Sequence, residues 1–327
     1  MVAVFTEVTE AEVVGLLESY ALGDYAGLAP IAEGVENTNY ILTTRGGDAG
    51  EGVCRHILTL IERRLTVADL PFFIALQQHL AARGVRCPEP RLPVSGPVVP
   101  ELKQKPVLLV SYLPGSALAQ SEVTEAHCYR LGVMLAQLHQ AASDFDAYQP
   151  NPVGFPYWEE AVRRIVPQAE RLGPDFAALL EEEVAYQRTH FPADLPGGII
   201  HADLFPDNCF WDEAGEISGV IDWFFACSAP YLYDLAICIN AWCFDVQHRL
   251  EPARMEALCA GYREGGPPSL AGWDQLKILC RAAALRFLVT RAEAWLYPEE
   301  GALVTAKSPE EYRYKLLCFR DAVRMPD

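Results

Sequence analysis

The apolar and polar positions in the first third of the chain predict a small sheet with helices. Thr9 and Glu12 form a T-x-x-E capping box, and apolar residues at helical spacing follow it, which predicts a first helix. These apolar residues are Val13, Leu16, Leu17 and Tyr20. Two apolar runs, 40–42 and 53–62, flank a glycine-rich turn at 45–52 and predict a β-hairpin with a long tip.

The next segment predicts a second helix and the end of the first lobe. This helix is expected to open near 66–69, where Asp69 would cap it, and to end at Gly84. The proline-rich segment 87–106 predicts loops and short edge strands, and the apolar run 106–113 predicts a buried strand. We therefore predict two domains, 1–110 and 111–327.

Beyond this boundary the pattern becomes mainly helical. Helices are predicted at 121–142, within 156–186 and from 231 onward, and short strands at 199–200, 209–211 and 217–221. A strand-rich first third followed by a helical lobe with one embedded hairpin predicts an α+β fold with two lobes. An alternating parallel sheet does not fit this order.

Candidate chemistry lies in the loop after the strand at 199–200. The pattern H-x-D-x-x-x-x-N places His201, Asp203 and Asn208 at fixed spacing, and Asp222 follows the next hairpin. ATP-dependent phosphoryl transfer needs one carboxylate to orient the attacking hydroxyl and accept its proton, which is the role predicted for Asp203. Asn208 and Asp222 are predicted to bind Mg²⁺. The alternative is a surface loop in which these side chains only cap turns.

Composition and charge narrow the class of partner. The 327 residues carry 26 Lys and Arg against 44 Asp and Glu, a net charge of −18. This balance argues against nucleic acid and anionic lipid as partners, whereas a bound metal would let so acidic a protein hold ATP. The ten cysteines form no C-x-x-C pair, and we expect reduced thiols. With no signal peptide or membrane span evident, we predict a cytoplasmic protein.

Several motifs resemble those of the aminoglycoside phosphotransferase/choline kinase superfamily, and more closely its homoserine kinase branch. They are EGVENTNYIL, HILTLIE, LPFFIALQQHLAARGV, HADLFPDN, IDWFFACSAPYLYDLAICINAWCF, RAAALRFLVTRAEAWL and EEYRYKL, in order from about residue 5 to 320. The resemblance implies a bilobal protein-kinase-like fold. It also implies transfer of the ATP γ-phosphate, with Mg²⁺, to the hydroxyl of L-homoserine for threonine biosynthesis.

The resemblance also suggests where the nucleotide binds. Gly34, Asn37 and Asn39 occupy the place of the glycine-rich loop, although they could simply close a turn. Thr59 stands where a kinase has its phosphate-binding lysine. The segment from Ser111 to Leu113 would pair with adenine. Another cation must then help to hold the phosphates, and the candidates are Arg55, Arg63, Lys103 and Lys105.

The remaining candidates concern support and the acceptor. In the superfamily, the aspartate at the position of Asp234 steadies the catalytic loop, and His201 is expected to brace this loop rather than act as the base. A zwitterionic acceptor needs a cation for its carboxylate, and we favour Arg286 over Arg281 and Arg291. Asn240, Trp242 and Asp245 are expected to line the acceptor pocket, although Trp242 could equally be core packing.

Two other functions stay open at this point. The chain could be a sibling kinase acting on an aminoglycoside, choline or another amino alcohol. It could also be a kinase-like binding protein without catalysis, since the phosphate-binding lysine is missing. A monomer or a homodimer is expected in either case.

Overall fold

The computed structural model describes residues 5–31, 37–47, 50, 52–192, 194–298, 307–321 and 323–326. The chain divides into two compact units, the first ending at Pro114 and the second beginning at Gly115. The sequence-based boundary lies four residues earlier, at 110/111. The two are called unit 1 and unit 2.

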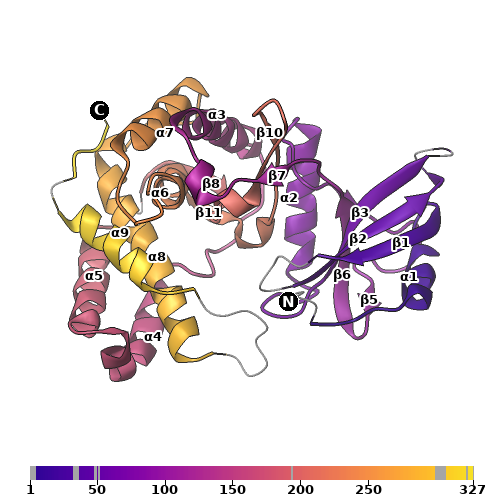
Figure 1. Ribbon diagram of the computed structural model, residues 1–327, viewed down its shortest axis with the longest axis horizontal. Helices are drawn as coiled ribbons and strands as arrows, with labels where there is room; N and C mark the ends of the chain where they lie inside the picture. The colour runs from indigo at the N-terminus through magenta and orange to yellow at the C-terminus, as the bar shows by residue number, and fades with distance from the viewer. Residues whose placement is uncertain are drawn as a thin grey trace. The chain divides into compact units, whose positions relative to one another are not determined.

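Among its described residues, unit 1 has an antiparallel sheet and the α-helices α1 and α2 (Figure 1). The strand order is β1-β2-β3-β6-β4, and β5 pairs with β6. The elements are α1 (Glu10–Leu17), β1 (Asp24–Pro30), β2 (Thr38–Arg45), β3 (Val53–Leu60), α2 (Leu70–Ala82), β4 (Pro90–Arg91), β5 (Glu101–Leu102) and β6 (Lys105–Ser111).

Helix α1 covers one face of this sheet and forms a core with it. The predicted capping box is present, because Thr9 accepts from the Glu12 N–H while the Glu12 carboxylate accepts from the Thr9 N–H. Three apolar residues of α1 pack against alternate residues of β2, β3 and β6, which therefore share a face. This cluster includes Val13, Leu16, Leu17, Tyr40, Leu42, Leu58, Leu60, Val107 and Leu109.

Two local expectations for unit 1 need correction. Strand β1 was not predicted, because its sequence DYAGLAP is mostly exposed and breaks its register between Tyr25 and Gly27. Asp69 stands at the N-cap position, just before α2, but its side chain caps no helical N–H, since its carboxylate accepts from the N–H and the hydroxyl of Thr66. Gly84 does end the helix, with φ at +82°.

Unit 2 is mainly helical, as predicted. Its α-helices are α3 (Glu125–Ala142), α4 (Phe155–Ile165), α5 (Phe176–His190), α6 (Tyr231–Trp242), α7 (Pro252–Glu264), α8 (Leu276–Leu296) and α9 (Glu310–Arg320). Its short 3-10 helices are η2 (Gln120–Glu122), η3 (Val166–Leu172), η4 (Pro206–Asn208), η5 (Trp223–Phe225) and η6 (Trp273–Gln275). Helix α6 is buried on all sides, and α9 lies along α8 (Figure 1).

Helices α3 and α7 approach each other at glycine positions. A Cβ atom on Gly132 of α3 would lie 2.2 Å from the Leu258 carbonyl oxygen, and one on Gly261 of α7 would lie 2.0 Å from that of Tyr129. Neither position has room for a side chain. The two helix backbones can therefore pack at a distance that other residues would prevent.

Two small sheets carry the loops of interest in unit 2. One has the order β10-β9-β7 and contains the predicted hairpin, and the other pairs β8 with β11. The strands are β7 (Ser116–Ala117), β8 (Gly197–Ile200), β9 (Cys209–Trp211), β10 (Ile217–Val220) and β11 (Cys227–Pro230). Strands β7 and β11 were not predicted, because two to four residues without alternation give no periodic signal. The α+β class is confirmed.

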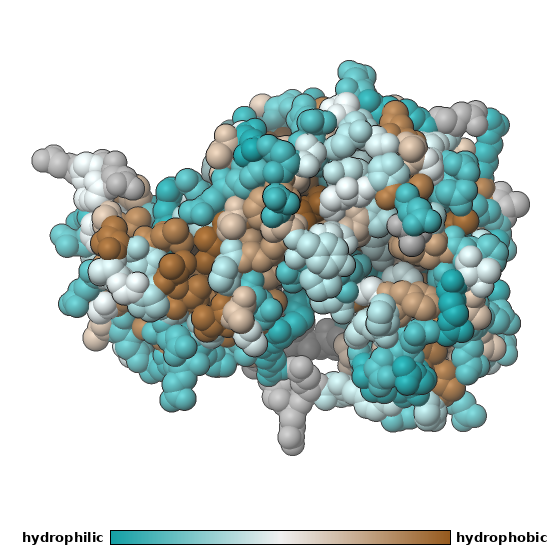
Figure 2. Space-filling view, turned by 180° about the vertical axis from the view of Figure 1, so that it is seen from behind, coloured by the Kyte–Doolittle hydropathy of each residue, from teal (hydrophilic) through white to brown (hydrophobic). Residues whose placement is uncertain are grey.

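All ten cysteines lie in the described part of the chain and are free thiols. Eight are buried, and only Cys54 and Cys318 are partly exposed. The face shown in Figure 2 is largely hydrophilic, with hydrophobic residues gathered on part of unit 1. None of the helices among the described residues is long and apolar enough to cross a membrane.

Candidate active site

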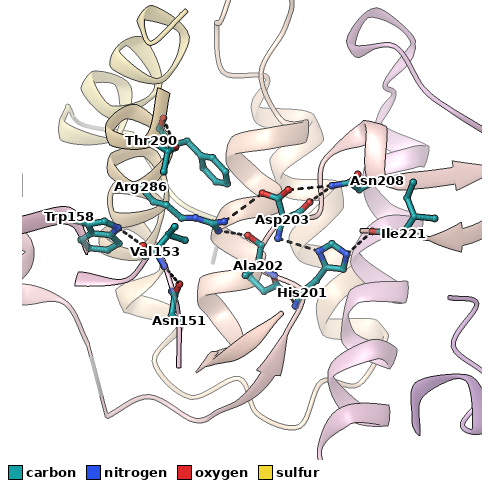
Figure 3. Close-up of polar contacts among 12 residues, drawn as sticks. Asn151, Val153, Trp158, His201, Ala202, Asp203, Asn208, Ile221, Arg286 and Thr290 are labelled. Atoms are coloured by element: carbon teal, nitrogen blue, oxygen red, sulfur yellow. Dashed lines mark hydrogen bonds and ion pairs between the residues drawn. The ribbon is translucent and has the colours of Figure 1, made fainter. Parts of the chain in front are cut away.

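The predicted catalytic loop begins where β8 ends and leads into β9 (Figure 3). Its first residues leave regular structure sharply, because Ala202 adopts φ of +62°, a left-handed conformation that is costly for a residue with a side chain. Asp222, which follows β10, also has a positive φ, of +60°. The two segments that carry the predicted chemistry thus both contain a strained backbone position.

Asp234, in the first turn of α6, holds the start of this loop. Its two carboxylate oxygens accept the backbone N–H groups of His201 and Ala202, each at 2.8 Å, and His139 Nε2 lies 3.1 Å from one of them. Burial alone would raise the pKa of Asp234, but its hydrogen bonds with the His139 side chain and with the His201 backbone N–H lower it. This geometry is what the predicted supporting role requires.

His201 links the loop to the end of β10. Its Nε2 atom lies 2.9 Å from the Ile221 carbonyl oxygen, and its Nδ1 atom accepts the Asp203 N–H at 3.2 Å. Burial lowers the pKa of His201, so the ring is neutral, with its proton on Nε2 facing the carbonyl. Both ring nitrogens are engaged by backbone groups, and the bracing role of His201 stays a prediction.

Asp203 and Asn208 face each other across the loop. The Asn208 amide donates to the Asp203 carbonyl oxygen at 2.8 Å and approaches its carboxylate at 3.4 Å. The Asp203 side chain is 17% exposed, so a small molecule can reach it. Because the Asn208 nitrogen is used within the loop, its Oδ1 atom is the one that remains to bind a cation.

Asp222 follows directly on a residue that is tied to this loop. The Ile221 N–H donates to the Asn208 carbonyl at 3.0 Å, and the Ile221 carbonyl accepts from His201. The amide oxygen of Asn208 and the carboxylate of Asp222 are both hard oxygen donors of the kind that Mg²⁺ prefers. Among the described residues no group of three or more His, Cys, Asp or Glu could hold a metal by itself. With these two donors from the protein, a bound Mg²⁺ would take its other ligands from phosphates and water.

Two residues predicted to line an acceptor pocket lie in the core instead. Asn240 and Trp242 are fully buried in α6. Asn240 donates to the carbonyls of Ala236 and Cys280, and Trp242 donates from Nε1 to the Leu204 carbonyl at 2.9 Å. A helix buried on every side leaves these residues no open surface. Trp242 contacts the predicted catalytic loop at the buried residue Leu204.

The other acceptor candidates have protein partners. Asp245, in the loop after α6, accepts from Arg249. Arg281 binds Glu183 through two hydrogen bonds, and Arg291 binds Glu311.

Arg286 does reach the site, but from a buried position. Its side chain is 1% exposed, and its guanidinium contacts the Ala202 carbonyl oxygen and lies 3.6 Å from the Asp203 carboxylate (Figure 3). We expected Arg286 to face the open acceptor pocket. The structure instead places it behind the loop.

The predicted nucleotide residues of unit 1 are held by the sheet. Gly34 lies outside the described residues. The Asn37 side chain accepts the Glu62 N–H at 3.2 Å, and Asn39 accepts from the Thr59 hydroxyl at 2.8 Å. Ser111 exchanges backbone and side-chain hydrogen bonds with Glu89, and Leu113 is partly buried. Nucleotide contact by these residues stays a prediction.

The four candidate cations of unit 1 occupy different environments. Lys105 pairs with the buried carboxylate of Glu62 at 2.5 Å, and Lys103 pairs with Glu12. Arg63 lies over the Phe5 ring and Arg55 over the Tyr112 ring, the latter at 3.9 Å. Alternation along β3 places Arg55 on the same face as Thr59, opposite the face that packs on α1.

Sequence reasoning missed the residues behind Asp234. His139, at the end of α3, is fully buried and bridges Asp234 to the hydroxyl of Tyr262 on α7, at 2.9 Å. The available signal was a histidine within the apolar stripe Leu131, Leu135 and Leu138, since a buried polar group needs partners. Its partners are distant in the sequence, so the pattern could not identify them.

A model of the phosphotransferase enzyme family matches residues 27–273. The chain is 42% identical over 314 residues to a homoserine kinase of Azorhizobium caulinodans, covering 96% of this chain and 95% of that one. It is 43% identical over 316 residues to a homoserine kinase of Xanthobacter autotrophicus, with 96% and 95% covered.

Solved structures of kinases share the fold. An amicoumacin kinase in complex with AMP-PNP, Ca²⁺ and Ami superposes with a TM-score of 0.68 at 15% identity, over 96% of this chain and 92% of that one. A microcompartment-associated aminopropanol kinase superposes with a TM-score of 0.64 at 17% identity, over 96% and 97%. These likenesses confirm the expected kinase-like fold.

Proposed function

The chain belongs to the phosphotransferase enzyme family, and from its similarity to homoserine kinases we propose that it is one. It would transfer the γ-phosphate of ATP to the side-chain hydroxyl of L-homoserine, giving O-phospho-L-homoserine and ADP, a step of threonine biosynthesis. The acceptor assignment rests on relatives that match over nearly their whole length. The phosphoryl-transfer chemistry is supported by the loop that presents Asp203 beside Asn208.

Asp203 is proposed to act on the acceptor hydroxyl. As the hydroxyl oxygen forms its bond to the γ-phosphorus, the bond from that phosphorus to the bridging oxygen of ADP breaks, and the hydroxyl proton passes to the Asp203 carboxylate. The carboxylate must therefore be held in one position. Asn208 and His201 supply this by binding the Asp203 carbonyl and N–H.

Asn208 and Asp222 are proposed to hold Mg²⁺ together with the ATP phosphates. A bound Mg²⁺ ion neutralises phosphate charge, which matters in a chain of net charge −18. The Asn208 amide is oriented by its hydrogen bond to Asp203, so Oδ1 points away from that residue. Asp222 is positioned by the backbone contacts of Ile221.

The cellular setting is part of the same proposal. Ten free thiols fit a reducing compartment, so we propose that the enzyme acts in the cytoplasm, as a monomer or a homodimer, on small molecules and not on nucleic acid. Light scattering of the purified protein would determine the oligomeric state.

An acceptor panel with matched variants tests the function. With Mg²⁺ and ATP, ADP release measured by a coupled assay should be much faster with L-homoserine than with choline, kanamycin or 1-amino-2-propanol. Asp203→Ala should lower kcat by at least about 1,000-fold while nucleotide affinity stays within about threefold. Asp207→Ala is the matched control, since this side chain of the same loop is 66% exposed.

The outcomes separate the alternatives. Preference for an amino alcohol or an aminoglycoside would make the chain a sibling kinase. Binding of Mg-ATP without ADP release on any acceptor would favour a non-catalytic protein. Full turnover by Asp203→Ala would remove Asp203 from the mechanism.

A further inference from the structure

The peptide groups on either side of Ala202 are bound by charged side chains. Asp234 accepts the Ala202 N–H at 2.8 Å, and the Arg286 guanidinium donates to the Ala202 carbonyl (Figure 3). Asp234 comes from α6 and Arg286 from α8, so two different helices hold the two ends of one residue. The next residue in the chain is Asp203.

Arg286 lies where a charge is costly unless it has partners. Its side chain is 1% exposed, and its guanidinium carbon lies 4.4 Å from the ring centre of Phe287 and 5.1 Å from that of Phe225. These rings favour a cation at their faces, while the loop carbonyl and the Asp203 carboxylate supply the opposite charge. The site is thus built to keep a guanidinium against the loop.

Ala202 needs such support because of its backbone conformation. With φ of +62°, an alanine pays a steric penalty that glycine would not pay. Strained positions of this kind persist only where surrounding contacts over-determine them. The contacts of Asp234 and Arg286 meet that condition, and Ala202 is itself fully buried.

We infer that Arg286 is a positioning residue, which together with Asp234 fixes Ala202 in its left-handed conformation and so directs the Asp203 carboxylate toward the acceptor. This inference deepens the proposed function and rests on it for the role of Asp203. It differs from a substrate-binding role, because Arg286 would act through the loop without touching homoserine.

Kinetics of Arg286 variants test the inference. Arg286→Met should lower kcat about 100-fold, because small displacements of a reacting group have effects of this size, while KM for homoserine and for ATP stays within about threefold. Arg286→Lys retains the charge without the planar fork and should recover part of kcat. Arg281→Met is the control on the same helix, with kcat expected near wild type although the protein loses its pairing with Glu183.

A double variant separates positioning from general damage. Ala202→Gly reaches the left-handed conformation without steric cost, so in the Arg286→Met background it should raise kcat about fivefold or more. In the wild-type background it should give no such gain. If Arg286→Met does not fold, the same comparison is made in the Arg286→Lys background.

Several results would overturn the inference. A rise confined to KM for homoserine in Arg286→Met would make Arg286 a substrate-binding residue. Strict additivity of the Ala202 and Arg286 effects would show that Arg286 does not act through Ala202. A crystal structure of Arg286→Lys or Arg286→Met gives a readout that needs no acceptor: Ala202 should leave the left-handed region in Arg286→Met. If the wild-type enzyme ignores homoserine, the proposed function fails, while this structural readout still tests the loop.

Discussion

At the scale of single residues, the partners of its backbone hydrogen bonds hold the loop at 201–208, the predicted catalytic loop, in place. The N–H groups of His201 and Ala202 bind Asp234, the carbonyl of Asp203 binds Asn208, and the carbonyl of Leu204 binds Trp242. A buried loop without regular structure must satisfy these groups by side chains, since each unpaired one is costly. Polar residues far apart in the sequence therefore form one hydrogen-bonded network with the loop.

Asp234→Asn probes the anchor of this loop. In this variant an NH₂ group replaces one carboxylate oxygen. In either orientation this group, itself a donor, would face another donor, a backbone N–H or His139 Nε2, so one buried hydrogen bond is lost. We expect the free energy of unfolding to fall by about 1–3 kcal/mol. Urea denaturation measures this, and unchanged stability would contradict the anchoring role.

The sequence identifies the residues whose spacing is local and misassigns those whose partners are remote. His201, Asp203 and Asn208 were placed in one loop because a fixed spacing relates them. Asn240 and Trp242 were expected in the acceptor pocket because they come soon after the predicted metal ligand Asp222 in the chain, but α6 is buried on all sides and its polar groups bind other backbones. The carbonyl that Arg286 binds lies 84 residues away in the chain, and no periodicity reveals it.

At the scale of elements, packing between helices determines where these residues lie. The α3 and α7 backbones meet at Gly132 and Gly261, which brings His139 on α3 to Tyr262 on α7 and to Asp234 on α6. Helices with clear caps and stripes, such as α1, could be predicted from the sequence. Strands β1, β7 and β11 could not, because they are short or irregular and depend on their partners.

Helices α8 and α9 are joined by a partly buried cluster of charged side chains. Glu311 on α9 pairs with Arg291 of α8 and with Lys315, one turn along α9, each at 2.5 Å. Lys315 is only 3% exposed. Burial raises the pKa of Glu311, but the charges of Lys315 and Arg291 outweigh this and lower it to about 2.

Glu311→Gln should therefore destabilise the protein in a pH-dependent way. The pKa of Glu311 is below its ordinary value of 4.5 in the folded state, so its contribution is fully present above about pH 4.5 and is lost as the pH falls toward 2. The shift corresponds to about 3 kcal/mol at neutral pH. Thermal unfolding of wild type and variant should show a gap that narrows through this range, and a gap independent of pH would contradict the assignment.

At the scale of the whole molecule, the chain consists of two units with separate cores and an acidic surface. Unit 1 has its sheet packed on α1, and unit 2 has its helices around the buried α6. Long segments with a clear periodicity can be recognised as helix or strand from the sequence. The order of strands and helices along the chain therefore predicts this division. Side-chain placement within the site depends on contacts between elements, which this order does not contain.

Thiol labelling tests the packing of both units at once. In the folded protein at most two of the ten cysteines, Cys54 and Cys318, should react quickly with a thiol reagent, and all ten should react after denaturation. Burial raises the pKa of Cys87 and of Cys227 to about 12, which slows them further by keeping the thiolate scarce. Fast reaction of more than two thiols would contradict the buried placement.

Because these cysteines are distributed unevenly between the two units, their reactivity reports the order in which the units unfold. Of the buried thiols, Cys87 alone belongs to unit 1, and the other seven belong to unit 2. Peptide mapping after a brief alkylation pulse in mild denaturant would therefore reveal which half melts first, with no probe introduced. An enzyme whose two units melt separately could lose turnover while most of its interior is still intact.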